Sequence, residues 1–276
     1  MDIPKGSMEA DLAYKEVNGQ KIYLTFLPPL IRTLDKAPVY VVICGGGWHD
    51  ESRAKMLTSA AISIERLRNQ GFAAVSIDYR TYAEGNGVYM EQIISDCFDS
   101  LRYLAHFADI LQIDPHRIAT CGHSAGGHLA LMIAYAPNHV FCKDSILNDD
   151  FTVTVTAPLS PLTVTHGDFT SYTQCDMPRL YAPGSTEEDR RKTSPITYVS
   201  SSSPATILAA GTADELIYDR SSRELYAALQ AANVPSELLL STNGGHCFEE
   251  VHPGMTPSVS KQEVHKQIAE FILQHI

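Results

Sequence analysis

Residues 122–126 read Gly-His-Ser-Ala-Gly and carry the first sign of chemistry in this sequence. They lie between an apolar run at 117–121 and an Ala- and Leu-rich run at 125–136. A serine on a sharp turn between a strand and a helix exposes its hydroxyl, and small neighbours allow close approach. The start of a helix also favours the negative charge that develops during acyl transfer. GxSxG alone is a common pattern, but this context predicts Ser124 as a nucleophile.

A serine nucleophile needs a base within hydrogen-bond reach, and the base needs a carboxylate to orient it. When the serine lies on such a strand-to-helix turn, the partners follow in the order serine, acid, histidine. Asp214 comes shortly after the apolar run 205–210, and His246 comes after the next run, 237–240. The ends of these runs would place both side chains beside the serine. We therefore predict a catalytic triad of Ser124, Asp214 and His246.

Other residues compete for the acid and base roles. Asp214 could instead cap a helix, and Asp219 is the reserve carboxylate. The sequence has eleven histidines, and His252 is the main rival because it lies close to His246. The remaining minority candidates for the base are His49, His128 and His166.

Hydrolysis also needs hydrogen-bond donors aimed at the developing oxyanion. Three glycines, Gly45, Gly46 and Gly47, follow the apolar run 40–44, and glycine backbone can turn its N–H groups inward. We expect Gly46 or Gly47 to form the oxyanion hole together with the N–H of Ala125. A phosphate-binding loop is disfavoured, because GxGxxG is absent and no P-loop lysine follows.

Four aromatic or histidine side chains near these motifs are candidates for substrate binding. Trp48 and His49 follow the glycine loop, His123 precedes the serine, and Tyr82 follows the apolar run 72–77. We expect them to line the entrance of the site, with packing as an equal alternative for the aromatic residues.

The elements that must position these residues alternate between strand and helix. Apolar runs predict strands at 40–44, 72–77, 117–121, 152–157, 205–210 and 237–240. Helical periodicity predicts helices at 54–70, 90–111, 125–136, 221–232 and 260–274. This alternation is typical of an α/β fold with a mostly parallel sheet and helices on both faces. We predict one domain over 1–276, with the irregular segment 160–194 as a small cap insertion over the site.

The composition disfavours several classes of function. The net charge is −11 with no basic run, which disfavours nucleic acid and anionic membrane surfaces as partners. No apolar stretch reaches bilayer length and residues 1–20 are polar, so we expect a cytoplasmic protein, with a removed secretion signal left open. We expect no metal or organic cofactor. The cysteines form no CxxC pair and are expected to be buried small apolar residues: Cys44, Cys97, Cys121, Cys142, Cys175 and Cys247.

These motifs resemble those of the α/β-hydrolase superfamily, and within it the esterase and lipase group with HGGGW, DYR, GHSAGG and a final GH. Here they read CGGGW at 44–48, DYR at 78–80, GHSAGG at 122–127 and GH at 245–246, and the resemblance covers residue 37 to the C-terminus. It implies the α/β-hydrolase fold, the triad and the oxyanion hole named above, and internal ion pairs for Asp78 and Arg80. Cys44 replaces the usual histidine, which leaves open how the glycine loop is braced.

The resemblance also implies a reaction, namely two-step transfer of an acyl group through Ser124 to water. The sequence is most similar to bacterial esterases that act on acetylated or feruloylated plant carbohydrate and to short-acyl carboxylesterases. A small-molecule or carbohydrate ester is therefore the expected substrate, and a homodimer stays open. The alternatives are an amide hydrolase similar to kynurenine formamidase and, less favoured because no triad member is missing, a non-catalytic ligand-binding relative.

Overall fold

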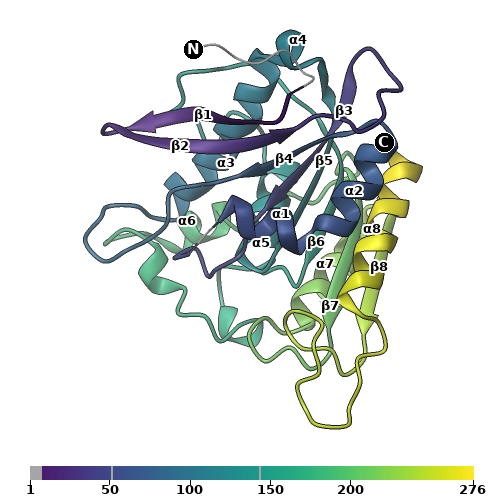
Figure 1. Cartoon of the computed structure of the whole chain (residues 1–276). Coiled ribbons are helices and arrows are strands. Elements are labelled where there is room, and N and C mark those ends of the chain that lie inside the picture. The colour runs from purple at the N-terminus through teal and green to yellow at the C-terminus, as the bar shows by residue number, and fades with distance from the viewer. Residues whose placement is uncertain (1–7, 51, 143) are drawn as a thin grey trace.

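The computed structural model describes residues 8–50, 52–142 and 144–276, and its centre is one eight-stranded sheet (Figure 1). The strands are β1 (Ala10–Val17), β2 (Gln20–Leu27), β3 (Ala37–Ile43), β4 (Ala73–Ile77), β5 (Ile113–His123), β6 (Val153–Leu159), β7 (Ala205–Gly211) and β8 (Ser236–Ser241). Their order across the sheet is β1-β2-β4-β3-β5-β6-β7-β8. β1, β2 and β4 pair antiparallel, and β4 and all later neighbours pair parallel. The predicted mostly parallel sheet is confirmed.

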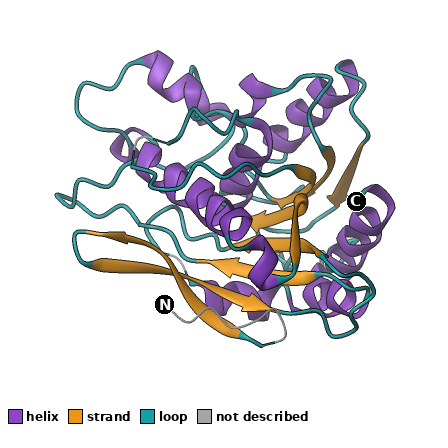
Figure 2. Ribbon diagram, turned by 90° about the horizontal axis from the view of Figure 1, so that it is seen from above, coloured by secondary structure: helices purple, strands orange, loops and turns teal. Residues whose placement is uncertain are grey.

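Helices cover both faces of this sheet (Figure 2). The helices are α1 (Arg53–Ser59), α2 (Ala61–Asn69), α3 (Met90–His106), α4 (Ala108–Leu111), α5 (Ala125–Tyr135), α6 (Glu187–Lys192), α7 (Arg220–Ala231) and α8 (Lys261–His275). α3, α5 and α7 pack on one face, and α1, α2 and α8 pack on the other. Within the described residues, no helix has the length and apolar character that crossing a membrane requires.

β3 shows why the central strands must be apolar throughout. Val39, Val41 and Ile43 belong to the hydrophobic core on the α3 and α5 side. Tyr40 and Val42 belong to the core on the α2 and α8 side. Because successive side chains of a strand point to opposite faces, a strand covered on both faces has no position for an exposed polar residue.

The strand order reverses its direction at β3. From β3 the chain moves to β4 on one side, and it later returns to β5 on the other side of β3. In open α/β sheets, ligands bind in the crevice outside the carboxyl ends of the strands at such a switch point. The glycine loop follows β3 and Ser124 follows β5, so both lie at this crevice.

The structure adds elements that were not predicted and divides two that were. The antiparallel hairpin of β1 and β2 was not foreseen. The predicted helix 54–70 is broken at Ala60 into α1 and α2, and the predicted helix 90–111 is broken at Phe107 into α3 and α4. The other predicted strands and helices are present, with ends that shift by a few residues.

The segment predicted as a cap, 160–194, consists of short elements. It contains the 3-10 turns η1 (Phe169–Ser171) and η2 (Pro178–Leu180) and the helix α6, and η3 (Pro195–Tyr198) follows it. Thr173 bridges to Ile217 in the loop after β7, which ties the segment to the chain beyond β7. Whether it acts as a cap stays a prediction.

Among the described residues, which include all six cysteines, there is no disulfide. Cys44, Cys97 and Cys121 are buried, as predicted. Cys142 and Cys175 are half-buried, and Cys247 is exposed because it lies in the loop after β8 rather than in a strand. The prediction of burial was therefore wrong for Cys247.

A buried network of charges joins the hairpin to α3. The carboxylate of Asp96 on α3 contacts Lys15 Nζ and Arg80 Nε, each at 2.7 Å, and its side chain is 0% exposed. Lys15 also contacts Asp99, which pairs with Arg102. Arg80 thus forms an internal ion pair, as predicted, and its partner is Asp96.

Asp78, the other predicted member of an internal pair, contacts Arg53 at the start of α1 rather than Arg80. Arg53 also contacts Asp11 on β1 at 3.1 Å. This cluster ties the end of β4 and the start of α1 to the hairpin.

Replacing the buried carboxylate at Asp96 should destabilise the fold strongly. Asp96→Asn removes the carboxylate shared by Lys15 and Arg80, so that Lys15 keeps only Asp99 and Arg80 keeps only Asp144 at 3.7 Å. Breaking such a buried pair costs about 3 kcal/mol of unfolding free energy. Urea denaturation measures this change. Asp109→Asn is the matched control, because Asp109 pairs with Lys36 at the exposed surface and its loss should leave the midpoint almost unchanged. Equal midpoints for the two variants would contradict the role given to Asp96.

Candidate active site

Ser124 lies on a strained turn between β5 and α5. Its backbone has φ 59° and ψ −121°, outside the common regions for a residue with a side chain. Such a conformation costs on the order of 1–3 kcal/mol and persists only where the surroundings impose it. The Ser124 N–H donates to the carbonyl of Leu159 on β6 at 2.8 Å, and the residue follows directly after the last residue of β5. This is the geometry that the GxSxG context predicted.

Glycines around the turn are required by close approach of backbone to backbone. A Cβ at Gly122 would lie 2.1 Å from the carbonyl oxygen of Gly126, and a Cβ at Gly126 would lie 2.2 Å from that of Ile43. A Cβ at Gly45 would lie 2.4 Å from the carbonyl oxygen of His123. The end of β3, the turn and the start of α5 therefore meet at distances that only glycine permits.

Asp214 and His246 form the hydrogen bond expected of an acid and a base. His246 Nδ1 donates to Asp214 Oδ2 at 2.7 Å. The other oxygen, Oδ1, accepts from the N–H groups of Leu216 and Ile217, each at 2.9 Å, and the Asp214 side chain is 0% exposed. These contacts fix the carboxylate. With Nδ1 donating, Nε2 is the basic atom of the neutral ring.

The two loops that carry the acid and the base are joined through their backbones. Ala213 N–H donates to the carbonyl of Gly244 at 2.9 Å, and Thr212 N–H donates to that of Ser241 at 3.0 Å. A Cβ at Gly211 would lie 2.1 Å from the carbonyl oxygen of Gly244. These backbone contacts hold the loops after β7 and β8 together, and with them the side chains of Asp214 and His246.

His123 holds the backbone of the predicted base. Its Nε2 donates to the carbonyl oxygen of His246 at 2.8 Å, and the two rings lie 4.6 Å apart. Ser160 Oγ donates to the same carbonyl at 3.1 Å. Burial lowers the pKa of His123 to about 4, so this ring is neutral near pH 7 and serves as a hydrogen-bond donor. Ser160 was not predicted, and no motif marks it in the sequence.

The glycine loop is a tight turn with three successive residues at positive φ. Gly46 has φ 140°, Gly47 has φ 60° and Trp48 has φ 62°. The Gly46 carbonyl accepts from the N–H groups of His49 and Asp50 at 3.1 and 3.0 Å. A Cβ at Gly46 would lie 1.8 Å from the carbonyl oxygen of Asp50, so glycine is required there.

The brace of this loop lies at Trp48 and His128. The Trp48 side chain is 1% exposed, and its Nε1 donates to His128 Nδ1 at 3.3 Å. His128 Nε2 in turn donates to the carbonyl of Thr193 at 2.8 Å. The Cys44 carbonyl accepts from the hydroxyl of Tyr79 at 2.8 Å. These contacts show how the loop is held in a chain with cysteine at position 44.

One cavity of about 330 Å³ brings these parts together. Its lining comes from the glycine loop, α1, the turn at Ser124 (the elbow), the loop after β7, the loop after β8 that carries His246 (the histidine loop) and the start of α8. The lining residues are Cys44, Gly45, Gly46, Gly47, Lys55, Met56, Ser59, His123, Ser124, Leu216, His246, Cys247 and Lys261. The N–H of Ala125 begins α5, where a helix leaves its first N–H groups without partners inside the helix. The cavity therefore brings together Ser124, His246 and the glycine loop, whereas Ala125 is not among the residues that line it. The oxyanion hole stays a prediction.

Of the four residues predicted to line the entrance, only one is found in the lining of the cavity. His123 lines the cavity, whereas the Trp48 side chain belongs to the core. The rings of His49 and Tyr82 meet edge to face at 5.2 Å, and neither is among the described residues that line this cavity. Contact of His49 and Tyr82 with substrate stays a prediction.

None of the reserve candidates is among the residues that line this cavity. Asp219 precedes α7 and pairs with Arg223 at 2.8 Å. His252 is exposed in the loop after β8. His128 is buried, and His166 bonds to Ser194. Among the described residues, no three His, Cys, Asp or Glu side chains gather in a group that could hold a metal ion.

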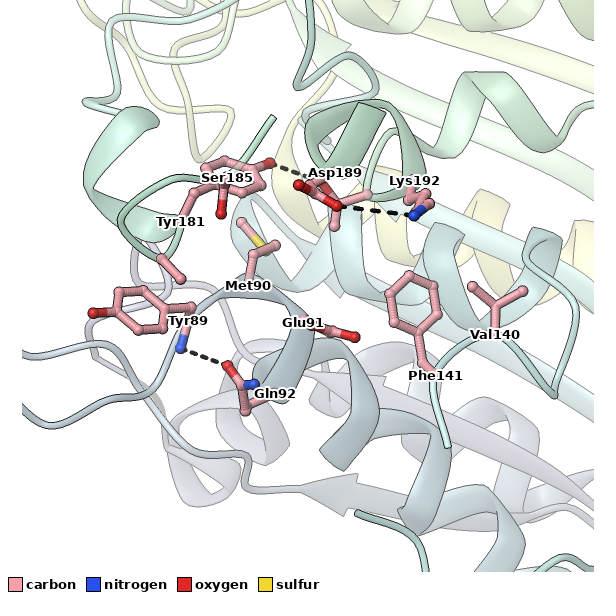
Figure 3. A pocket seen from close by; sticks show the side chains of 12 residues that line it. Tyr89, Met90, Glu91, Gln92, Val140, Phe141, Tyr181, Ser185, Asp189 and Lys192 are labelled. Carbon is pink, nitrogen blue, oxygen red and sulfur yellow. Dashed lines mark hydrogen bonds and ion pairs between the residues drawn. The ribbon is translucent and has the colours of Figure 1, made fainter. Parts of the chain in front are cut away.

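A second cavity of about 260 Å³ lies between the start of α3, the chain after α5 and the region of α6 (Figure 3). Tyr89, Phe141 and Tyr181 contribute aromatic walls, and Asp189 and Lys192 pair across 3.8 Å at its edge. Neither Ser124 nor His246 lines it. We therefore place the chemistry in the first cavity.

Comparison with protein families fits this geometry. The BD-FAE family matches residues 26–229, which include the glycine loop, the elbow and Asp214. The chain belongs to the BD-FAE family. The solved structure of Est2, a thermophilic esterase of Thermogutta terrifontis with propionate bound, has a TM-score of 0.78 and 22% identity, covering 96% of this chain and 94% of that chain. The α/β-hydrolase fold is thereby confirmed.

Two curated relatives match shorter segments. The carboxylesterase NlhH of Mycobacterium tuberculosis is 34% identical over 109 residues, which are 40% of this chain and 32% of NlhH. The non-reducing polyketide synthase Preu6 of Preussia isomera is 30% identical over 129 residues, which are 45% of this chain and 6% of Preu6. The chain therefore spans a third or less of the length of these relatives.

The buried His128 should make stability depend on pH. Burial lowers the pKa of His128 to about 4, against 6.5 for an ordinary histidine. Between these values the unfolded chain binds a proton and the folded chain does not, so stability falls as the pH drops from 6.5 to 4 and the loss is complete below 4. A shift of this size corresponds to about 3 kcal/mol.

His128→Gln tests this pH dependence, because glutamine offers an oxygen to Trp48 and an N–H to Thr193 without titrating. Urea denaturation of both proteins at several pH values between 7 and 4 gives the two stability curves. We expect the wild type to lose about 3 kcal/mol more than the variant over this range. Parallel curves would show that His128 is not the titrating group.

Proposed function

We propose that this protein is a serine carboxylesterase that hydrolyses short-acyl esters. The observation that carries the proposal is that Ser124, on its strained turn, shares one cavity with His246 and the glycine loop, while Asp214 holds His246 through a 2.7 Å hydrogen bond. Membership of the BD-FAE family and the match to a carboxylesterase support it. Acetyl and feruloyl esters of plant carbohydrate are the proposed natural substrates, on the basis of the sequence motifs.

The proposed mechanism has two steps, and His246 transfers protons in both of them. Ser124 Oγ attacks the ester carbonyl while His246 Nε2 takes its proton, and Asp214 stabilises the ring as it becomes charged. The N–H groups of Gly46 or Gly47 and of Ala125 bind the oxyanion. His246 then protonates the leaving alcohol, which leaves an acyl group on Ser124. Water, deprotonated by the same ring, releases the acid and restores the serine.

The size of the cavity agrees with small esters. A volume of about 330 Å³ is near the lower end of the range for small-molecule sites in proteins. Its apolar lining includes Met56 and Leu216. We therefore expect hydrolysis rates to fall as the acyl chain lengthens.

Hydrolysis of p-nitrophenyl acetate, butyrate and decanoate tests the function. Ser124→Ala and Asp214→Asn should each lower kcat by roughly 10⁴-fold or more, because both act in the same catalytic unit. Asp219→Asn is the matched control, since its carboxylate pairs with Arg223 away from this site, and it should keep nearly full activity. Full activity of Ser124→Ala would show that Ser124 is not the nucleophile.

Acetylated xylan, methyl ferulate and formylkynurenine extend the same assay. Faster release from the first two than from p-nitrophenyl butyrate would support carbohydrate esters as substrates. If formylkynurenine were hydrolysed faster than every ester, the protein would be an amide hydrolase rather than an esterase. A wild type inert on all of them would favour a ligand-binding protein on this scaffold.

A further inference from the structure

Two lysines line the cavity of an otherwise acidic protein. Lys55 lies on α1 and is exposed, and Lys261 is the first residue of α8 and is half-buried. The whole chain carries a net charge of −11. The cavity that holds Ser124 is thus a local exception to the sign of the surface charge.

Neither lysine is neutralised by a carboxylate among the described residues. Other lysines do form such pairs: Lys15, Lys36, Lys192 and Lys266. Lys261 Nζ instead donates to the hydroxyl of Ser59 on α1 at 2.6 Å, a contact that fixes its position without removing its charge. Two positive charges are therefore left to face the cavity.

Two carboxylates act on the cavity residue Cys247, and both are already hydrogen-bonded. Glu249 accepts from the N–H of Cys247 at 2.6 Å and does not line the cavity. Asp214 is buried behind His246 and bonded to three donors. Neither of these two carboxylates is among the residues that line the cavity.

The charges of both lysines reach the lining next to the predicted base. Burial and the carboxylates of Glu249 and Asp214 raise the pKa of the Cys247 thiol, and the positive charges of Lys261 and Lys55 act in the opposite direction. The charge of Lys261 also contributes to the lowered pKa of His123, after burial and His246. A ligand bound beside Cys247 would therefore lie within reach of both ammonium charges.

From this arrangement we infer that the site selects esters that carry a carboxylate, with Lys55 and Lys261 as its specificity residues. The apolar walls at Met56 and Leu216 would bind the body of such a substrate, and the two ammonium groups would bind its charge. This inference rests on the proposed esterase function. It concerns which esters are preferred and adds no step to the reaction.

Paired substrates test the selection. Mono-4-nitrophenyl adipate differs from 4-nitrophenyl hexanoate by a carboxylate in place of a methyl group on the acyl side. 4-Acetoxybenzoate differs from 4-acetoxybenzamide by a carboxylate in place of an amide on the alcohol side. We expect kcat/KM of the wild type to favour the anionic member of at least one pair by about tenfold, a ratio that corresponds to 1.4 kcal/mol.

The double variant Lys55→Gln/Lys261→Gln should abolish this preference. The ratio of its kcat/KM values for the anionic and the neutral member of each pair should fall to about one, because glutamine carries no charge. Raising NaCl from about 20 to about 500 mM should lower the wild-type rate on the anionic ester and leave that of the double variant unchanged. Lys266→Gln on the same helix is the matched control, since Lys266 pairs with Glu263.

The possible outcomes separate this inference from the function on which it rests. Hydrolysis of the neutral esters that depends on Ser124, with no preference for either anionic ester, would overturn the charge selection and keep the esterase. Loss of the preference in Lys266→Gln as well would assign it to the general charge of α8 and also overturn the inference. No hydrolysis of any ester by the wild type would remove the esterase function itself.

Discussion

Backbone meets backbone at the carboxyl ends of β3 and β5, and the rest of the site depends on that contact. Gly122, Gly126 and Gly45 each occupy a place where a Cβ would lie within 2.4 Å of a carbonyl oxygen. Only with these atoms absent can α5 begin directly behind Ser124 and the glycine loop lie against the turn. The strained conformation of Ser124 follows from this packing, because the chain must change from strand to helix in one residue. The apolar strands on either side supply the burial that offsets the strain.

A second constraint acts through buried polar groups, each of which must be paired within the protein. Trp48, His128 and the Thr193 carbonyl form one such chain of hydrogen bonds, and they hold a loop in which three successive residues have positive φ. Packing of Trp48 thus supports the backbone of the glycines beside it. The same logic holds at the histidine loop, where His123 and Ser160 both donate to the carbonyl of His246. In both places a neutral histidine other than the predicted base holds a loop in position: His128 at the glycine loop and His123 at the histidine loop.

The sequence was sufficient for the central strands, the elbow and the pair of Asp214 and His246, because each follows an apolar run that cannot lie at the surface. It was insufficient where a contact joins residues distant in the chain. The hairpin escaped prediction because Lys15 interrupts its apolar pattern, and only the fold shows that Lys15 is buried against Asp96 and Asp99. The brace of the glycine loop, at His128, and the lysines of the cavity could not be foreseen either, since a single histidine or lysine carries no motif. Trp48 shows that a motif can also mislead. Its position next to the glycines predicted a side chain at the entrance of the site, but the side chain lies in the core.

The position of His246 along the chain affects when the site can first exist. The His123 ring and the His246 carbonyl that it binds are separated by 123 residues, and the acid and base loops are joined only when β8 pairs with β7 at the edge of the sheet. A ribosome makes the elbow, the glycine loop and most of the sheet long before it makes the base. During synthesis the proposed nucleophile is therefore present in a chain that still lacks its proposed base. On the proposed mechanism, Ser124 gains its reactivity only after β8 and the loop that follows it have been made.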